Sequence, residues 1–169
     1  MKTIFIARHA TTKSALENQH DSERPLTITG QNEAHWLGQF IRDHALPAQI
    51  LTSSAIRARQ TSGVIREALS PELPIDVHPE LYLAPPLQIT KTLKSLPSIL
   101  ETLALVGHNP GLSQFLLDIS GPSSHETAVN RIYGGLPPAG LAILECQIND
   151  WTEISRENTK LVNIFHPGE

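Results

Sequence analysis

The chain begins with Met1-Lys2-Thr3-Ile4-Phe5-Ile6-Ala7-Arg8-His9-Ala10, and this stretch sets the expectation for the fold. Its apolar run is short and rich in Ile and Phe, which indicates a buried strand rather than a helix. The run ends on Arg8 and His9. In an open α/β sheet, ligands bind outside the carboxyl ends of the strands, where these two side chains would stand. Taken alone, they also fit a strand that simply exits to solvent through polar residues.

The composition is that of an ordinary soluble protein. The 169 residues are 40% hydrophobic and 18% charged, which suits one domain over residues 1–169 with a full hydrophobic core. The 13 Lys and Arg against 17 Asp and Glu give a net charge of -4, which argues against nucleic acid or a membrane surface as a partner. No cleavable signal or membrane-spanning run is visible, so we expect a cytoplasmic protein. The one cysteine, Cys146, is expected to be a buried structural thiol.

The segment Thr11–Arg24 is polar and has no hydrophobic period. No Gly-rich turn follows the first strand, so the sequence has neither a dinucleotide-binding fingerprint nor a P-loop. A helix is predicted next, with Thr29 as its cap, Glu33 in its first turn and Pro47 at its end. A second strand, Gln49–Thr52, follows.

The next helix is predicted to begin with an accumulation of arginine. Ser54 is a candidate cap, which puts Arg57 and Arg59 in the first two turns. Cations are unfavourable at this end of the helix dipole, so their presence makes sense if an anion is held nearby. The alternative, that both arginines are solvated, is equally compatible with this segment.

The central part of the chain continues the alternation of strands and helices. We expect strands over Ile75–His78 and Thr102–Gly107, with a helix over Leu87–Leu96 between them. His108 then falls between a strand's carboxyl end and a helix predicted to have Asn109 as cap and Pro110 as first residue. A histidine at a turn is by itself more often structural than functional.

The last third is predicted to close one side of the sheet. Gly121–Asn130 is polar and irregular, whereas Gly140–Cys146 and Asp150–Ile154 resemble the two strands of a hairpin. Leu161–Phe165 is a final apolar stretch. The predicted fold class is therefore α/β, a three-layer α/β/α arrangement around a doubly wound, mostly parallel sheet with an antiparallel edge.

Two strand ends of this fold would deliver histidines to the same edge. His9 and His108 would be joined there by Arg8 and Arg57, with Glu80 in a nearby loop. No His-x-x-x-His or Cys-x-x-Cys spacing exists, so we expect no metal ion and no cofactor. Arginine offers bidentate contacts to phosphate oxygens, and neutral imidazole is a nucleophile toward phosphorus. The set therefore favours phosphoryl chemistry.

At this point the chain resembles the histidine phosphatase superfamily, in its phosphoglycerate mutase-like branch. The family's Arg-His-Gly signature reads Arg8-His9-Ala10 here, and its Ser-x-x-x-Arg-Ala-x-Gln-Thr motif matches Ser53–Thr61. The second family histidine corresponds to the one in Val106–Pro110, and Arg24–Thr27 with Gly30 matches a further element. These pieces occur in the family order and span nearly the whole chain. The short length and the Val-Gly-His-Asn-Pro-Gly form look like the SixA-type phosphohistidine phosphatases.

The resemblance implies a mechanism. His9 would attack the phosphoryl group in line and become phosphohistidine, which water would hydrolyse. Arg8, Arg57 and His108 would bind the phosphoryl oxygens, and Arg24 would be a further substrate contact. Glu80 would match the acid that protonates the leaving group in many family members.

These sequence features are compatible with three functions. The leading one is a metal-independent phosphatase that acts on phosphohistidine in a signalling protein. The second keeps this chemistry for a small phosphomonoester metabolite, which polar or cationic residues from Ser123–Arg131 closing over the site would favour. The third is a phosphate-binding module without turnover.

Overall fold

Six strands form one mixed sheet in the computed structural model, which describes residues 1–169. In chain order they are β1 (Lys2–Arg8), β2 (Gln49–Thr52), β3 (Ile75–Val77), β4 (Thr102–Gly107), β5 (Leu141–Cys146) and β6 (Thr159–Phe165). Their order across the sheet is β3-β2-β4-β1-β5-β6. The first four pair in parallel, whereas β5 runs antiparallel to both β1 and β6. The predicted mostly parallel sheet with an antiparallel side is confirmed.

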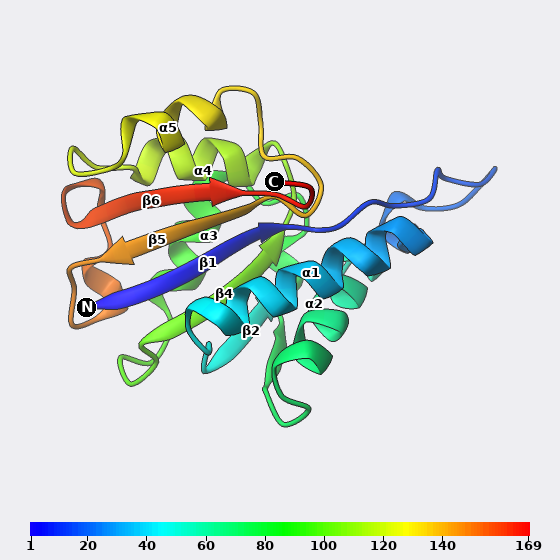
Figure 1. The fold of residues 1–169 in the computed structure, drawn as a ribbon, viewed down its shortest axis with the longest axis horizontal. Helices are drawn as coiled ribbons and strands as arrows, with labels where there is room; N and C mark the ends of the chain where they lie inside the picture. The colour runs from blue at the N-terminus through cyan, green and yellow to red at the C-terminus, as the bar shows by residue number, and fades with distance from the viewer.

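Helices cover both faces of this sheet (Figure 1). The helices α1 (Ile28–His44) and α2 (Ile56–Leu69) lie together on one face. The other face carries α3 (Pro86–Lys94), α4 (Gly111–Ile119) and α5 (Glu126–Ile132). Four short 3-10 helices complete the chain, namely η1 (Asp21–Glu23), η2 (Pro79–Leu81), η3 (Trp151–Glu153) and η4 (Arg156–Asn158). None of the helices is long and apolar enough to span a bilayer.

The central strand β1 has no polar face because it contributes to two cores. Ile4 and Ile6 belong to a cluster of 25 buried residues on the α3–α5 side. Phe5 and Ala7 belong to a cluster of 15 on the α1–α2 side. A strand covered on both faces must be apolar throughout, which explains the continuous hydrophobic run that predicted it.

Helix α1 begins earlier than predicted. Its cap is Thr27, whose Oγ1 accepts a hydrogen bond of 2.9 Å from the Gly30 amide, so Thr29 already lies inside the helix. Glu33 consequently falls beyond the first turn, and its carboxylate instead binds the Thr11 amide and hydroxyl at 2.8 and 2.9 Å. This contact ties the segment after β1 to α1.

The predicted caps of two other helices are also wrong. Helix α2 follows Ala55, which makes no side-chain cap bond, so Ser54 does not cap it. Helix α4 begins at Gly111, after a cis peptide bond between Asn109 and Pro110. The Asn109 side chain does not cap that helix and instead donates a 2.8 Å hydrogen bond to the Leu136 carbonyl. Asn109 therefore holds the loop before β5 against the start of α4.

The predicted partner of β5 is wrong as well. Asp150–Ile154 contains the 3-10 helix η3, in which Trp151 is fully buried and donates a 2.9 Å hydrogen bond to the Leu100 carbonyl. The strand that pairs with β5 is β6, which includes the final apolar stretch. The segment Gly121–Asn130, expected to be irregular, contains the start of α5.

Candidate active site

The carboxyl ends of β1 and β4 bring the two predicted histidines together. These strands are parallel neighbours, with Arg8 opposite Gly107 in the register. The His9 amide donates a 3.1 Å hydrogen bond to the Gly107 carbonyl, which locks the two strand ends to each other. The ring centroids of His9 and His108 are therefore only 5.2 Å apart.

His9 is buried, and a neighbouring carbonyl fixes which of its ring nitrogens carries the proton. Its Nδ1 lies 2.9 Å from the Ala10 carbonyl oxygen, which can only accept a hydrogen bond, so Nδ1 carries the proton. Nε2 then bears the lone pair, toward which Arg57 Nε donates at 3.2 Å. Burial is the largest cause that lowers the pKa of His9 from 6.5 to about 4, and the nearby arginines add to it. His9 is thus neutral at pH 7.

His108 is held by Ser53, which immediately follows β2. The Ser53 Oγ and the His108 Nε2 are 2.5 Å apart, and the His108 Nδ1 is buried without a partner. Burial, followed by the proximity of His9 and Arg57, lowers the pKa of His108 to about 3. The site therefore contains one buried ring nitrogen without a hydrogen-bond partner.

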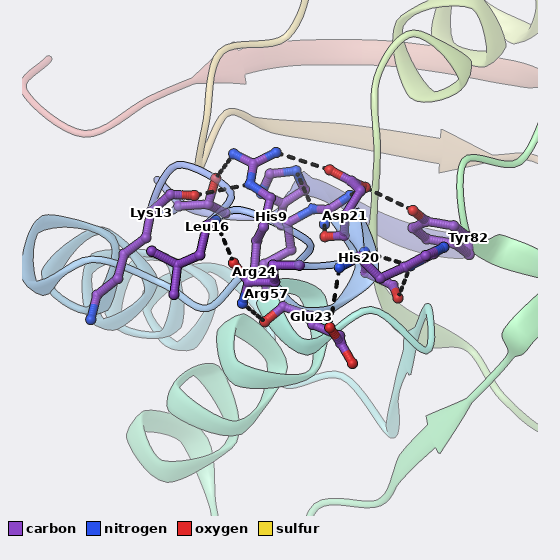
Figure 2. A network of polar contacts seen from close by, with 12 residues as sticks. His9, Lys13, Leu16, His20, Asp21, Glu23, Arg24, Arg57 and Tyr82 are labelled. Carbon is purple, nitrogen blue, oxygen red and sulfur yellow. Dashed lines mark hydrogen bonds and ion pairs between the residues drawn. The ribbon is translucent and has the colours of Figure 1, made fainter.

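Arg57, in the first turn of α2, has all three of its nitrogens engaged. Besides its contact with His9, Nη1 donates to the Asp21 carbonyl at 2.6 Å and Nη2 to the Asp21 carboxylate at 2.8 Å. The same carboxylate accepts hydrogen bonds from Arg24 Nη1 at 2.9 Å and from Tyr82 Oη at 2.7 Å. Figure 2 shows this network converging on Asp21 beside His9. The hydrogen bond from Tyr82, followed by those from Arg24 and Arg57, holds the pKa of Asp21 far below its usual range.

The other predicted site residues differ in how closely they join this group. Arg8 donates a 3.0 Å hydrogen bond to the Leu136 carbonyl, and its Nε is buried without a partner. Arg24 reaches the group through Asp21. Glu80 lies in η2, where it binds His78 Nδ1 at 3.0 Å and forms no hydrogen bond with the histidines or arginines of the site. His78 lowers the pKa of Glu80, so its carboxyl group is ionised at neutral pH.

Three residues of the site escaped prediction: Ser53, Asp21 and Tyr82. Ser53 directly follows a strand, so the rule that located His9 applies to it too. Asp21 lies in the segment without a hydrophobic period, and Tyr82 follows a proline-flanked turn. Neither carries a sequence signal of its position relative to His9.

Ala10, which replaces the glycine of the family signature, fits its place without strain. The residue is fully buried in the α1–α2 core, and its φ is not positive. Its amide donates a 3.1 Å hydrogen bond to Thr61 Oγ1 on α2. The backbone therefore needs no glycine here, and the methyl group adds to the core.

The donor set suits an anion rather than a cation. No group of three or more His, Cys, Asp or Glu side chains is placed to hold a metal ion. Two neutral imidazoles and the guanidinium groups of Arg8, Arg24 and Arg57 instead surround the end of β1. Guanidinium groups recognise phosphate and carboxylate oxygens through paired N–H donors.

Comparisons with known proteins agree with this chemistry. The family model described as the histidine phosphatase superfamily (branch 1) matches residues 4–82. An uncharacterized protein from Mycobacterium leprae is 31% identical over 151 residues, which cover 86% of this chain and 88% of the relative. The chain belongs to the histidine phosphatase superfamily and is a phosphatase by class.

Within this superfamily the fold is that of the SixA proteins. A protein from Agrobacterium tumefaciens assigned as phosphohistidine phosphatase SixA has a TM-score of 0.81 and 25% identity, covering 98% of both chains. Its counterpart from Nakamurella multipartitia has a TM-score of 0.85 at 24% identity, covering 99% of this chain and 97% of that one. The protein histidine phosphatase SixA in complex with tungstate has a TM-score of 0.73 at 22% identity and covers 98% of this chain and 97% of that one.

Proposed function

We propose that this protein is a metal-independent phosphatase that hydrolyses phosphohistidine on a signalling protein through a phosphorylated His9. The observation that carries the proposal is the neutral, buried His9, whose Nε2 lone pair faces the Arg57 guanidinium. A neutral imidazole can attack at physiological pH without first losing a proton.

In the first step His9 Nε2 forms a bond to phosphorus as the bond from phosphorus to the substrate imidazole breaks. The bonding electrons leave with that imidazole, which takes up a proton. In the second step water attacks the phosphohistidine, so phosphate departs and His9 regains its lone pair. Arg8 and Arg57 supply positive charge for the phosphoryl oxygens in both steps.

His108 is proposed to donate a hydrogen bond to the phosphoryl group. If the Ser53 hydroxyl donates to Nε2, the proton of the neutral ring must be on Nδ1, the buried nitrogen without a partner. Ser53 is then a positioning residue, since it sets the tautomer that makes His108 a donor. The 2.5 Å separation of Ser53 Oγ and His108 Nε2 places the hydroxyl within hydrogen-bond distance of the ring, as this role requires.

The environment of Glu80 favours phosphohistidine as the substrate. The role of Glu80 as general acid stays a prediction, but its carboxylate is paired with His78 and its pKa is lowered, so it holds no proton to donate at neutral pH. An alkyl phosphate needs a proton on a poor leaving group, whereas a histidine ring leaves readily once it is protonated. The names of the SixA proteins that share the fold point to the same substrate.

Polar or cationic residues of Ser123–Arg131 closing over the site would favour the small-ester alternative. Arg131 instead donates a 2.8 Å hydrogen bond to the Ile164 carbonyl and pairs with Glu169 at the end of the chain. No observation therefore favours a substrate enclosed by this segment.

The test compares a phosphorylated histidine-containing phosphotransfer domain with a panel of phosphorylated metabolites, all in EDTA. We expect the protein substrate to be turned over with the higher kcat/KM, and His9→Ala to lose at least about a thousandfold in rate. The matched control is His35→Ala, on the exposed side of α1. Full activity of His9→Ala would remove His9 as nucleophile, and a preference for a metabolite would establish the alternative substrate.

A further inference from the structure

The side chains proposed to bind an anion, Arg24, Arg57 and Tyr82, already bind a carboxylate of the protein itself. Both carboxylate oxygens of Asp21 are engaged, one by Arg24 and the other by Arg57 and Tyr82. These donors approach from η1's own flank, from α2 and from the residue after η2, so three separate parts of the chain converge on one acid (Figure 2). Such an arrangement is how proteins bind a free anion.

This occupancy also affects the nucleophile. Arg57 Nη1 binds the Asp21 carbonyl oxygen and Nη2 binds the Asp21 carboxylate. These contacts position the Arg57 guanidinium so that its Nε–H points at the His9 Nε2 lone pair. The Nε2 atom of His9, which must attack phosphorus, therefore accepts a hydrogen bond from Arg57. The Arg57 guanidinium, which must bind phosphoryl oxygens, already donates all of its hydrogen bonds within the protein. A phosphoryl group can reach both only when Asp21 releases Arg57.

We propose that Arg24, Arg57 and Tyr82 form a phosphoryl-binding site which the Asp21 carboxylate occupies in the free protein, so that Asp21 competes with substrate and product. This inference rests on the proposed function for the identity of the anion. It adds Tyr82 to the substrate-binding residues and gives Asp21 the role of a built-in competitor.

The segment that carries Asp21 is suited to release it. The η1 helix contains no buried residue, and the Asp21 side chain is 44% exposed, whereas that of Arg57 is 4% exposed. The loop between β1 and α1 extends away from the body of the molecule (Figure 1). An ion pair with one exposed member is weak, and a phosphate dianion brings more charge to the arginines than a carboxylate does. Phosphate is therefore expected to displace the Asp21 carboxylate from the two arginines.

The experiment measures the affinity for inorganic phosphate by isothermal titration calorimetry at fixed pH and salt. Asp21→Asn and Asp21→Ala are expected to bind phosphate about fivefold more tightly than the wild type, because the competitor is gone. Glu17→Gln is the matched control, since Glu17 is exposed in the same loop, makes no hydrogen bond or ion pair, and its loss changes the net charge equally. Two Asp21 variants, each checked by thermal unfolding, guard against a misfolded protein.

Tyr82 is tested in the Asp21→Asn background, where its hydroxyl no longer serves the competing carboxylate. Tyr82→Phe is expected to weaken phosphate binding there about fivefold. An unchanged affinity would remove Tyr82 from the site. If Asp21→Asn or Asp21→Ala binds phosphate no more tightly than Glu17→Gln, Asp21 is not a competitor, and weaker binding would make it a residue that positions Arg57.

These measurements involve no turnover, so they separate the inference from the proposed function. Tighter phosphate binding by the Asp21 variants of a protein that does not hydrolyse phosphohistidine would support the competitor and refute the function. Rapid hydrolysis by a wild type whose Asp21 variants show no gain in affinity would do the reverse. In the active enzyme the KM of Asp21→Asn should fall, whereas a merely structural role would raise it.

Discussion

At the residue scale, His9 is kept neutral by its burial. Removal from water disfavours the charged ring, and the positive charges of Arg57, Arg8 and Arg24 act in the same direction. Together these effects overcome the hydrogen bond to the Ala10 carbonyl, which favours protonation. His9, the proposed nucleophile, is thus neutral over the whole physiological pH range.

This environment predicts the titration of the ring. By NMR, we expect the His9 ring signals to stay those of the neutral form from pH 8 to pH 5 and to titrate at about pH 4. His9→Ala identifies the signals by their loss. A midpoint near the ordinary value of about 6.5 would contradict the burial argument.

The contact between Ser53 and His108 makes a second prediction. Ser53→Ala should lower kcat about tenfold, because the His108 ring can then place its proton on either nitrogen. His108→Ala should cost more, about a hundredfold, since the donor itself is lost. Steady-state kinetics on a phosphorylated domain measures both. A Ser53→Ala variant with wild-type kcat would show that the tautomer is set by other groups.

Apart from Arg24, which the family resemblance indicated, the sequence predicted the site where function coincides with a strand end or a helix start. Arg8 ends β1, His9 and His108 each follow a buried strand, and Arg57 lies in the first turn of α2, so each was visible as a pattern. The position of Asp21 depends on how a polar segment without a period folds back over His9. No local sequence pattern indicates that this segment packs over His9, because the contacts that hold it are hydrogen bonds of Arg57 and Tyr82 to Asp21, which lie far apart in the chain.

At the element scale, close backbone packing fixes how helices join the sheet. A Cβ at Gly111, the first residue of α4, would lie 1.8 Å from the Ala84 carbonyl oxygen. Gly63, inside α2, has nothing within 4 Å of a Cβ. The two glycines therefore form a matched pair for substitution.

We expect Gly111→Ala to lower the free energy of unfolding by about 2 kcal/mol or more, because backbone must move to accept the methyl group. Gly63→Ala should raise that free energy by about 0.5–1 kcal/mol, since alanine loses less entropy in a helix. Urea unfolding of both variants measures these effects. Equal changes in the two would contradict the packing described at α4.

Sequence reasoning located the four strands of the parallel part and also the antiparallel strand β5. The continuous apolar runs of β1 and β4 follow from burial on both faces. Strand β6 was missed because a bulge interrupts its pairing with β5 between Ile143 and Leu144, which breaks the alternation of buried and exposed side chains. In Asp150–Ile154 the buried residues are Trp151 and Ile154, three positions apart, which is the spacing of a 3-10 turn.

At the scale of the whole molecule, two buried neutral histidines make stability depend on pH. The unfolded chain binds protons at both rings as the pH falls below about 6.5, whereas the folded chain holds them neutral to about pH 4 for His9 and about pH 3 for His108. Protonation therefore favours unfolding in this window. Asp21 has a lowered pKa, so its stabilising contribution is lost only below its ordinary value of 3.8.

We expect the free energy of unfolding to fall by about 1–2 kcal/mol per pH unit between pH 6 and pH 4.5. His108→Asn should make this dependence shallower, whereas His35→Asn, at an exposed position on α1, should leave it closer to the wild type. Urea unfolding at a series of pH values gives the slopes. Stability that is constant or increases toward acid would contradict the buried neutral histidines.

Trapping the covalent intermediate tests the proposed nucleophilic role of His9 most directly. A phosphorylated histidine-containing domain labelled in its phosphoryl group is mixed with the enzyme, quenched within milliseconds in alkali and digested for mass spectrometry. We expect an acid-labile, alkali-stable phosphoryl group on His9, which is absent from His9→Ala. Label on another residue, or turnover by the wild type with no labelled enzyme at any time, would contradict it.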